Sequence, residues 1–513
     1  MSLFNGRLSK LQAIINIIDN KYVDHVDIDS LNELVIPDLL SRLDPHTSYV
    51  PAKRLNDAEK KILGYFYGIG IEHFAFDDTS TVINVIQGSP ASHADIKPGD
   101  KILQVDSTDV TGSNARNLAS TVLKGEFDTE VTLFLKRHGC DSTLTTVIRR
   151  GHVPVPAVIS DYMIDETTAY IKLESFSDNS YIQFASSVLQ LKKEGAKKLI
   201  IDLRDNLGGR LEQARLIASE IIDLGDTITY TIGRENVMED IYTSTNTNRL
   251  CDGMSIACIV DSHTASAAEI LSAAIQDNDR GAIIGRRTFG KGLVQTPIQM
   301  QDGSQVNLTT YRYYAPSGRS LQKSYKNYNN DLNIRTQNGE LDSAAAFHPS
   351  DTTKYFTKHG RTVYAKSGVM PDIFVPLDNT PQPYIAYKID SAYITMRYVA
   401  EMYNKLGFYN PREPEPYINA LFDNEQQTYD DLIAYAIQHG VNIDTRKQKK
   451  EIANAFHSVM DILKADAYYV TGNTNKYIMY INESDTDIKA AVEVLNDDER
   501  LHTILNDQTN STK

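Results

Sequence analysis

The chain has 513 residues, which is enough for three or four domains with ample hydrophobic cores. Its hydrophobic content of 41% and charged content of 23% are typical of globular proteins, and its formal net charge of −15 argues against binding to nucleic acids or anionic membranes. No stretch of the sequence is long and apolar enough to cross a bilayer, and the three cysteines, Cys140, Cys251 and Cys258, show no disulfide framework.

The first 60 residues predict a helical N-terminal region. Apolar residues recur at helical spacing from Leu8 to Asp19 and would form one stripe along a helix. The segment Met1–Lys10 lacks the apolar core of a signal peptide. We therefore expect that any targeting segment lies outside this chain.

Residues 64–150 predict a small separate domain with a glycine loop and a flanking helix. The helix is expected at residues 114–124, where Leu118 and Val122 lie one turn apart on one face. The loop consists of Tyr67, Gly68, Ile69, Gly70 and Ile71, and successive backbone N–H groups in such a loop can bind an anion. These features resemble a PDZ domain, which captures the free C-terminus of a peptide and adds the peptide to its sheet as an extra strand. An ordinary β-turn in a small barrel is the alternative.

Residues 154–376 predict an α/β core, because short apolar runs typical of buried strands alternate with helix-forming segments. The expected strands are Ala169–Leu173, Leu199–Leu203, Ile256–Val260 and Ala282–Gly285, and the helices between them include Ile182–Lys193 and Leu211–Ile222. Residues 324–366 form a polar insertion that is too long for a turn. We expect this insertion to border the active site or to be partly mobile.

A serine follows the third expected strand, in the sequence T-A-S-A-A-E at positions 264–269. Because Ala265–Ile275 has a helix-forming composition, Ser266 is expected where a strand turns into a helix. Free backbone N–H groups and the positive end of the helix dipole lie at such a position. The position suits a nucleophile that leaves an oxyanion behind it. A serine that only caps the helix is the alternative.

A lysine lies between two glycines in T-F-G-K-G-L-V-Q, at positions 288–295. Lys291 can act as the base for a serine if it is held in its neutral form. An unperturbed lysine titrates near ~10.4, so a working value near ~7–8 requires about 4 kcal/mol of desolvation. Only a buried site can supply this desolvation, and a solvated turn lysine is the alternative.

The oxyanion that forms in such a reaction needs two N–H donors. Ala267, immediately after the serine, is expected to supply one. The second is expected from the Gly208–Gly209 turn, since glycine lets a backbone amide point into a crowded site. The alternative is that these glycines simply end a strand. Three charged residues at the same strand end are interpreted as structural ion-pairing groups: Asp202, Arg204 and Asp205.

Other chemistries fit the sequence less well. The segment G-R-R-T-F-G-K-G at 285–292 is close to a phosphate-binding P-loop, but Gly292 stands where that loop needs serine or threonine. The following Leu293–Met300 alternates like a strand, whereas a P-loop opens a helix. His263 lies near Ser266 but has no obvious orienting partner for a Ser–His–Asp triad. The sequence has no H-E-x-x-H motif of a metallopeptidase, and we expect neither a metal nor a cofactor.

Residues 380–513 predict a mostly helical C-terminal extension. Helices are expected at Tyr393–Leu406, Tyr429–His439, Lys450–Lys464 and Asp487–Leu495. The third of them carries a one-sided stripe formed by Ile452, Phe456, Val459 and Leu463. We interpret the extension as a packing or dimerisation appendage, with a substrate-guiding arm as the second interpretation.

From about residue 40 to residue 372, a series of motifs resembles the carboxyl-terminal processing peptidases, also called tail-specific proteases. Besides the serine and lysine motifs, the series contains D-P-H-T-S-Y (44–49), Y-G-I-G-I (67–71), G-S-P-A-S-H-A-D-I-K-P-G-D-K-I (88–102), I-I-D-L-R-D-N-L-G-G (200–209), R-Y-Y-A-P-S-G-R-S-L-Q (312–322) and G-V-M-P-D (368–372). The resemblance implies that Ser266 is the nucleophile, Lys291 the general base and Gln295 the residue that orients the lysine. It favours Gly209 within the glycine turn.

The same resemblance implies an α/β fold with a crotonase/ClpP-like core of stacked sheets and an inserted PDZ domain. It also implies an N-terminal region that often mediates dimer contacts, and export to the periplasm, the cell envelope or an organelle lumen. A cytoplasmic location is the alternative.

The sequence therefore predicts a serine endopeptidase that cleaves proteins near their C-termini through an acyl-enzyme. Its partners would be protein or peptide substrates held by their tails, and a homodimer is possible. A non-catalytic peptide-binding scaffold is the alternative, although Ser266, Lys291 and Gln295 are all intact. We also expect the free enzyme to be partly gated until a peptide binds the PDZ-like domain.

Overall fold

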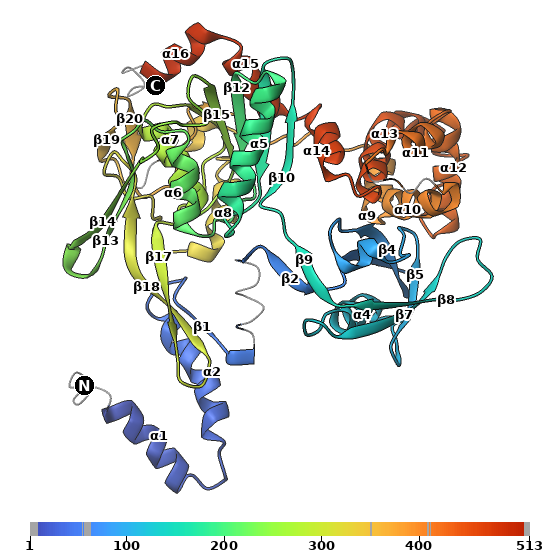
Figure 1. Cartoon of the computed structure of the whole chain (residues 1–513), viewed down its shortest axis with the longest axis horizontal. Helices are drawn as coiled ribbons and strands as arrows, with labels where there is room; N and C mark the ends of the chain where they lie inside the picture. The colour runs from blue at the N-terminus through green and yellow to red at the C-terminus, as the bar shows by residue number, and fades with distance from the viewer. Residues whose placement is uncertain are drawn as a thin grey trace.

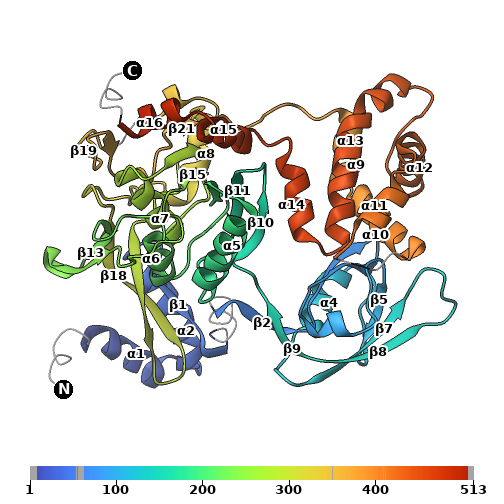
Figure 2. The same cartoon turned by 45° about the horizontal axis from the view of Figure 1, so that its top comes forward.

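The chain folds into two lobes, which lie side by side in Figures 1 and 2. This computed structural model describes residues 9–53, 55, 63–348, 351–407, 410 and 412–506. One lobe contains the N-terminal helices and the α/β core. The other contains the glycine-loop domain and a bundle of C-terminal helices.

The N-terminal region consists of helices α1 (Ser9–Lys21) and α2 (Ile28–Ser41) and strand β1 (Ser48–Val50). Leu8, the expected start of the first helix, and residues 56–60 lie outside the described residues. Asp27 caps α2 by accepting hydrogen bonds from two backbone N–H groups of its first turn. β1 pairs antiparallel with β18 (Gln305–Tyr314) of the core, so this region is not purely helical.

The PDZ-like domain is built on one antiparallel sheet with helix α4 (Ala115–Leu123) packed against it. In spatial order the main strands are β3 (Ile71–Phe76), β4 (Thr79–Val85), β5 (Lys101–Val105), β7 (Glu130–Lys136) and β8 (Leu144–Arg149), with the short β6 (Thr108–Asp109) paired to β5 and the 3-10 helix η1 (Pro90–His93) after β4. Leu118 and Val122 of α4 pack, partly buried, on the core of this domain. Strand β3 comes first in the spatial order of the sheet, so it is an edge strand.

The glycine loop is shorter than the sequence predicted. Tyr67 and Gly68 belong to strand β2 (Tyr65–Gly68), which pairs antiparallel with β9 (Gly151–Pro154). Only Ile69 and Gly70 remain between β2 and β3. Gly70 has a φ of +84°, and a Cβ there would lie 2.1 Å from Cβ of Ser89, so both its conformation and its surroundings require glycine.

The core contains a six-stranded sheet with helices on both faces. Its strands, in spatial order, are β10 (Val158–Met163), β11 (Thr168–Leu173), β12 (Lys198–Asp202), β15 (Ser255–Val260), β16 (Ala282–Gly285) and β21 (Ile373–Phe374), all parallel except β10. Helices α5 (Ser180–Glu194), α6 (Leu211–Ser219) and α7 (Ala267–Asp277) share a hydrophobic cluster with one face. Every residue of β11 is buried, as expected for a strand covered on both sides.

The second face of this sheet is covered by helices from the end of the chain, α15 (Thr486–Leu495) and α16 (Asp498–Asn506). Buried Ile488, Val494 and Leu495 pack there with Ile200 and Ile259 of the sheet. The last helices are therefore part of the α/β core rather than of a separate appendage.

A second, antiparallel sheet lies beside the first. It joins β1 to β18, and continues through β13 (Thr227–Ile232) to β14 (Met238–Thr243), while β17 (Leu293–Gln299) also pairs with β18. The short helix η2 (Arg234–Asn236) connects β13 and β14. In Figure 1 the β17–β18 hairpin reaches from the core toward the N-terminal helices.

The insertion at residues 324–366 contains short ordered elements. They are η3 (Tyr328–Asn330), α8 (Asp331–Gln337), η4 (Ala344–Ala346) and the hairpin of β19 (Lys354–Phe356) and β20 (Thr362–Tyr364). Residues 349 and 350 lie outside the described residues.

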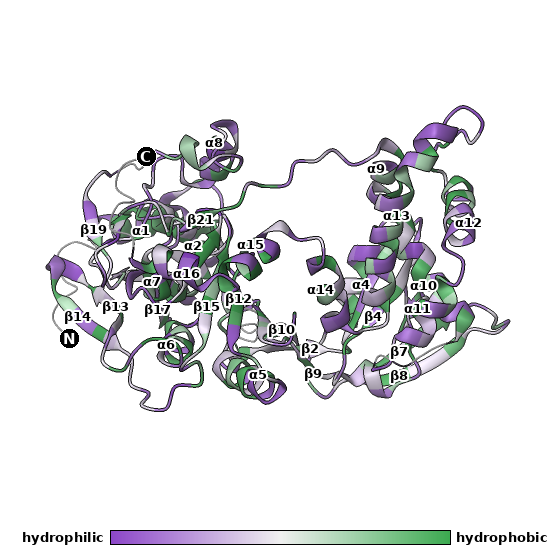
Figure 3. Cartoon of the chain, turned by 90° about the horizontal axis from the view of Figure 1, so that it is seen from above, coloured by the Kyte–Doolittle hydropathy of each residue, from purple (hydrophilic) through white to green (hydrophobic). Residues whose placement is uncertain are grey.

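The C-terminal bundle consists of α9 (Tyr384–Ser391), α10 (Ile394–Leu406), α11 (Glu415–Leu421), α12 (Glu425–Gln438) and α13 (Lys449–Val470), followed by α14 (Thr474–Asn482). Val459 and Leu463 of the predicted stripe are buried in this bundle, and Ile452 and Phe456 are partly buried. Phe76 and Ile83 of the PDZ-like sheet belong to the same hydrophobic cluster, so the bundle and that sheet pack together. Figure 3 shows the segment between β21 and α9 crossing from one lobe to the other. Among the described residues, no helix is long and apolar enough to span a membrane.

Candidate active site

Ser266 occupies the predicted junction between a strand and a helix. β15 ends at Val260, and Ser266 is the N-cap residue of α7. Its backbone has a φ of +58° and a ψ of −118°, a conformation that non-glycine residues rarely adopt and that proteins retain mainly at functional sites. The sequence therefore placed this serine correctly, and the backbone around it is strained.

Glu269 joins the serine to the loop that carries Lys291. Its carboxylate is fully buried and accepts hydrogen bonds from the backbone N–H of Ser266 at 3.0 Å, of Gly290 at 2.7 Å and of Lys291 at 2.7 Å. The hydroxyl of Thr288 donates to it as well, at 2.5 Å. This role of Glu269 was not predicted from the sequence, although the S-x-x-E spacing is a known helix-start signature that pairs the two residues.

Lys291 is half-buried and faces the same cavity as Ser266. Burial lowers the pKa of its amine below the usual value, while the nearby carboxyl groups of Glu269 and Asp44 act in the opposite direction. Tyr313 is buried, and its hydroxyl, which has a single proton to donate, lies within hydrogen-bond distance of the carbonyl oxygens of Ser266 and Lys291. The environment thus favours the neutral amine that a lysine base requires.

The shared cavity has a volume of about 710 Å³. Of the predicted site residues, it brings together Ser266, Ala267, Lys291, Gln295 and Gly209. Its other walls are largely apolar and include Ile270, Leu293 and Val294. Such a cavity can hold an extended peptide segment with apolar side chains beside the serine.

The glycine turn lies directly against the serine. Gly208 has a φ of +96°, and a Cβ there would lie 2.7 Å from Cβ of Ser266. The N–H of Gly208 donates to the side chain of Asn206 at 2.8 Å, so it is already engaged. The residues on both sides of Gly209 bond to Phe176. The N–H of Phe176 donates to the carbonyl oxygen of Gly208, and the N–H of Arg210 donates to the carbonyl oxygen of Phe176. In this parallel pairing the N–H of Gly209 points away from Phe176. Of the two glycines, the second is better placed as a donor.

Ala267 is the first residue of α7. Its N–H therefore has no acceptor inside the helix. With Ala267 and Gly209 both lining the cavity, two backbone donors are available beside the serine.

Gln295 lies in the cavity but is turned toward another group. Its side-chain nitrogen donates to the hydroxyl of Thr309 at 3.1 Å. Gln295 was expected to orient Lys291, but no hydrogen bond joins these two described residues. The backbone N–H of Thr309 donates to the hydroxyl of Thr47 at 3.2 Å, and that hydroxyl donates to Asp44 at 2.6 Å. Gln295 thus belongs to a polar network that starts in the D-P-H-T-S-Y motif.

Two known domain families match this chain. Residues 167–332 match peptidase family S41, and residues 67–148 match the PDZ domain. The carboxy-terminal processing protease CtpA of Bacillus subtilis (strain 168) is 32% identical over 320 residues, which cover 62% of this chain and 67% of that protein. This chain belongs to the carboxyl-terminal processing peptidases.

Other members are similarly distant. The probable CtpA-like serine protease of Staphylococcus aureus (strain N315) is 30% identical over 317 residues, which cover 62% of this chain and 63% of the relative. Among solved structures, a photosystem II D1 C-terminal processing protease aligns with 72% of this chain and 93% of its own, at 24% identity and a TM-score of 0.38.

In this member of the family, His46 of the D-P-H-T-S-Y motif also lines the active-site cavity. Its Nε2 lies 2.6 Å from the hydroxyl of Tyr328. Burial and the positive charge of Lys291 lower the pKa of His46 to about 4, so its ring is neutral near pH 7. Because Tyr328 belongs to the insertion at residues 324–366, that insertion adjoins the cavity that holds Ser266 and Lys291.

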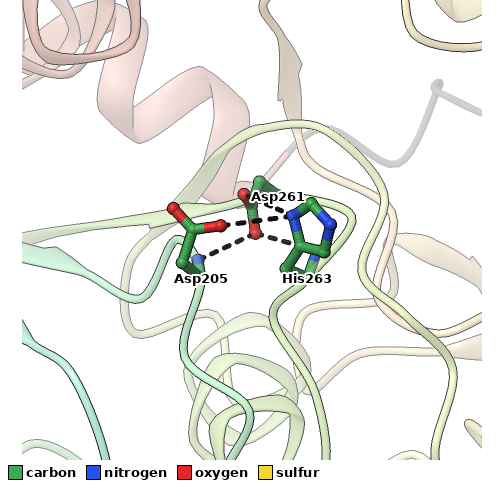
Figure 4. A group of neighbouring side chains, drawn as sticks. All are labelled: Asp205, Asp261 and His263. Atoms are coloured by element: carbon green, nitrogen blue, oxygen red, sulfur yellow. Dashed lines mark hydrogen bonds and ion pairs between the residues drawn. The ribbon is translucent and has the colours of Figure 1, made fainter. Parts of the chain in front are cut away.

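Figure 4 shows three side chains beside the strand ends of this peptidase core, from Asp205, Asp261 and His263. One ligand atom from each lies within 4.8 Å of the others, close enough for a metal ion. However, Asp261 already accepts hydrogen bonds from the backbone N–H of Asp205, His263 and Thr264, and the side chain of His263 is 52% exposed. These contacts explain the group as a polar turn. His263 was expected to have no orienting partner, but its Nδ1 lies 3.2 Å from a carboxylate oxygen of Asp205, which becomes its neighbour only in the folded chain.

Asp202 and Arg204 form the predicted structural ion pair, at 2.7 Å. Burial opposes ionisation of Asp202, but Lys172 and Arg204 outweigh this and hold its pKa below the usual value. Arg204 also pairs with Asp485 at 2.6 Å and with Asp487 at 3.1 Å. These residues therefore tie the start of α15 to the core.

Proposed function

We propose that this protein is a serine endopeptidase in which Ser266 is the nucleophile and Lys291 the general base. The observation that carries the proposal is that both side chains line one cavity, in a setting that lowers the pKa of the lysine. Membership of peptidase family S41 supports the same reaction class.

In the proposed reaction, the neutral amine of Lys291 takes the proton of the Ser266 hydroxyl while Oγ attacks the carbonyl carbon of the scissile bond. The N–H groups of Ala267 and Gly209 stabilise the oxyanion that forms. The ammonium of Lys291 then returns the proton to the leaving amine, and an acyl-enzyme remains. Water, activated by the same amine, hydrolyses the ester and restores the serine.

We further propose that the PDZ-like domain selects substrates by their C-terminal tails. Backbone N–H groups of the turn at Ile69 and Gly70 would bind the terminal carboxylate, and the edge strand β3 would pair with the peptide. The match of residues 67–148 to the PDZ domain supports this role. We also propose that the free enzyme is partly gated until a peptide binds the PDZ-like domain. The support for this is that the side chain of Gln295 contacts Thr309 rather than Lys291 in this structure.

Three broader expectations remain proposals. A crotonase/ClpP-like core is supported by helices α5 to α7 on one face of the parallel sheet and by the second sheet beside it. A homodimer and a location in the periplasm or cell envelope follow from the family alone.

The decisive experiment compares the wild-type chain with Ser266→Ala and Lys291→Ala on an unfolded protein substrate. We expect both variants to lose at least about a thousandfold in kcat/KM, as removal of a nucleophile or base does in other serine proteases. Equal digestion by all three proteins would refute the mechanism, whereas no digestion even by the wild type would favour a peptide-binding scaffold. Substrates with an amidated C-terminus test tail capture separately, because they should be cleaved more slowly than the matching acids.

A further inference from the structure

A second cavity lies between the PDZ-like sheet and the C-terminal helices, and we call it the junction pocket. It has a volume of about 360 Å³. Strand β3 contributes Glu72, His73 and Phe74, and the helical side contributes Tyr393, Asp466 and Tyr469. Because its two halves come from segments more than 300 residues apart, the pocket exists only when the bundle is docked on the PDZ-like domain.

Aromatic rings form the walls of the junction pocket. The rings of Phe74 and Tyr393 lie 4.4 Å apart between their centroids, and those of Tyr469 and Tyr477 lie 5.2 Å apart. Phe74 already carries one cation, because the guanidinium of Arg116 on α4 lies 4.8 Å from its ring centroid. Such rings attract a cation and also contact the apolar stem that bears it.

Two carboxyl groups give the junction pocket acidic character. The hydroxyl of Tyr469 donates to Glu72 at 2.6 Å. Burial and the charge of Asp390 raise the pKa of Asp466 to about 7, while a hydrogen bond from Thr395 acts in the opposite direction. A bound cation would favour the ionised form of Asp466. The nearby Arg397 is itself paired with Asp77 at 2.9 Å.

His73, next to Glu72 on β3, also lines the pocket, but its side chain is turned toward α4. Its Nε2 lies 3.2 Å from the hydroxyl of Ser120 on α4. Burial, helped by Arg116, lowers the pKa of His73, so the ring is neutral near pH 7. When Nε2 donates to Ser120, Nδ1 is left as an acceptor, and this buried atom has no partner among the described residues.

The junction pocket adjoins the edge where a substrate tail would bind. A peptide that pairs with β3 directs alternate side chains to opposite faces of the sheet. One set points toward α4 and the PDZ-like core. The other set points to the face that carries Glu72, Phe74 and Phe76, which is the face covered by the C-terminal helices.

From this geometry we infer that the junction pocket receives a lysine or arginine side chain of the substrate tail, from a residue whose side chain points away from α4. The inference rests on the proposed tail capture by the PDZ-like domain. It makes the C-terminal bundle a specificity element, and it predicts that the enzyme prefers tails with a basic residue at one particular position.

The test uses the full chain with Ser266→Ala, so that bound peptides stay intact. Fluorescein-labelled eight-residue peptides with a free C-terminus carry lysine, the neutral isostere norleucine or glutamate at each of the last five positions in turn. Fluorescence anisotropy gives Kd for each. At one position we expect lysine to bind about fivefold more tightly than norleucine, the size of a partly desolvated cation–π contact, and glutamate to bind most weakly.

The preference for lysine should disappear in Asp466→Asn and shrink in Glu72→Gln, while the norleucine peptide keeps its affinity. Asp461→Asn is the matched control, because Asp461 lies on α13 but outside the pocket. Glu72 lies on an exposed part of β3, so Glu72→Gln provides the test if Asp466→Asn does not fold.

The outcomes separate the two proposals. If amidation weakens binding but lysine and norleucine bind alike at all five positions, tail capture stands and the junction-pocket inference is wrong. If the lysine preference survives both pocket substitutions, the inference is also wrong. If amidated and free tails bind alike, tail capture fails and the inference fails with it.

Discussion

At the residue scale, the proposed reaction depends on the protonation of one amine. Burial lowers the pKa of Lys291 below the usual 10.5, so the neutral base is available at lower pH than for an exposed lysine. We therefore expect kcat/KM for a peptide substrate to rise roughly tenfold per pH unit on the acidic side. It should reach its plateau below pH 10.5. Initial rates at low substrate concentration over a pH series measure kcat/KM. A kcat/KM that still rises at pH 10.5 would contradict the role of Lys291 as the general base.

Gly208 sets the distance between the glycine turn and the nucleophile. An alanine there would place a Cβ 2.7 Å from Cβ of Ser266 and 2.9 Å from the nitrogen of Ala267. We expect Gly208→Ala to lower kcat/KM by about a hundredfold, because a displacement of about 1 Å at a catalytic group costs that much.

Gly225→Ala is the matched control for this substitution. Gly225 has a similar φ of +85°, but no atom of the described residues lies within 4 Å of a Cβ added there. It shares the backbone strain without the collision. Equal losses of activity in the two variants would show that strain alone, and not the approach to Ser266, explains the effect.

At the element scale, helix α15 is fixed to the core by a buried charge. Asp487 accepts hydrogen bonds from Arg286 at 3.0 and 2.8 Å, and it also pairs with Arg204. Its side chain is 4% exposed. Asp487→Asn leaves the guanidinium of Arg286 buried without its countercharge, which costs about 3–5 kcal/mol in comparable pairs.

Urea denaturation measures this loss of stability. Glu493→Gln, on the same helix, is the control, since Glu493 is 71% exposed and lies 3.9 Å from Arg500. Exposed pairs of this kind contribute at most about 1 kcal/mol. If both variants unfold at the same urea concentration, α15 is not held by Asp487.

The sequence predicted strands and helices well where neighbouring residues alone determine them. The strand before the serine was expected at Ile256–Val260 and runs from Ser255 to Val260. The expected helix Leu211–Ile222 instead ends at Ser219. Ile221 and Ile222 beyond it are fully buried, so they continued the apolar pattern without continuing the helix.

Contacts between distant segments could not be predicted in this way. Glu269 was visible as part of a motif, but its hydrogen bonds to Gly290 and Lys291 form only when α7 and the following loop fold together. His46 reaches the cavity because β1 pairs with β18, far along the chain. The cover that α15 provides for the sheet has the same origin. Single-sequence periodicity contains no information on such pairs.

At the scale of the whole molecule, the PDZ-like domain and the C-terminal bundle are packed as one lobe. Gly99 lies at their contact, where a Cβ would be 2.5 Å from the carbonyl oxygen of Ala400 and 2.8 Å from Cβ of Asn404. We expect Gly99→Val to push α10 away from the domain. Hydrogen exchange should then become faster in α10 and β4 but stay unchanged in β11 and β12 of the core.

Gly139→Val is the control for Gly99→Val. Gly139 belongs to the same domain and has a φ of +76°, and within the part of the chain that the structure describes no atom lies within 4 Å of an added Cβ. Faster exchange in α10 in both variants would mean that the substitution unfolds the domain rather than separating it from the bundle.

The route of the chain between the lobes has a mechanical consequence. It leaves the core at β2, returns at β9, leaves again along residues 375–383 and comes back through α14 (Figure 1). The last crossing is also fixed to the core, because α14 packs on β10 and the hydroxyl of Ser160 donates to Asn475 at 2.5 Å. A single cut in any one crossing would therefore leave the two lobes joined by the other three.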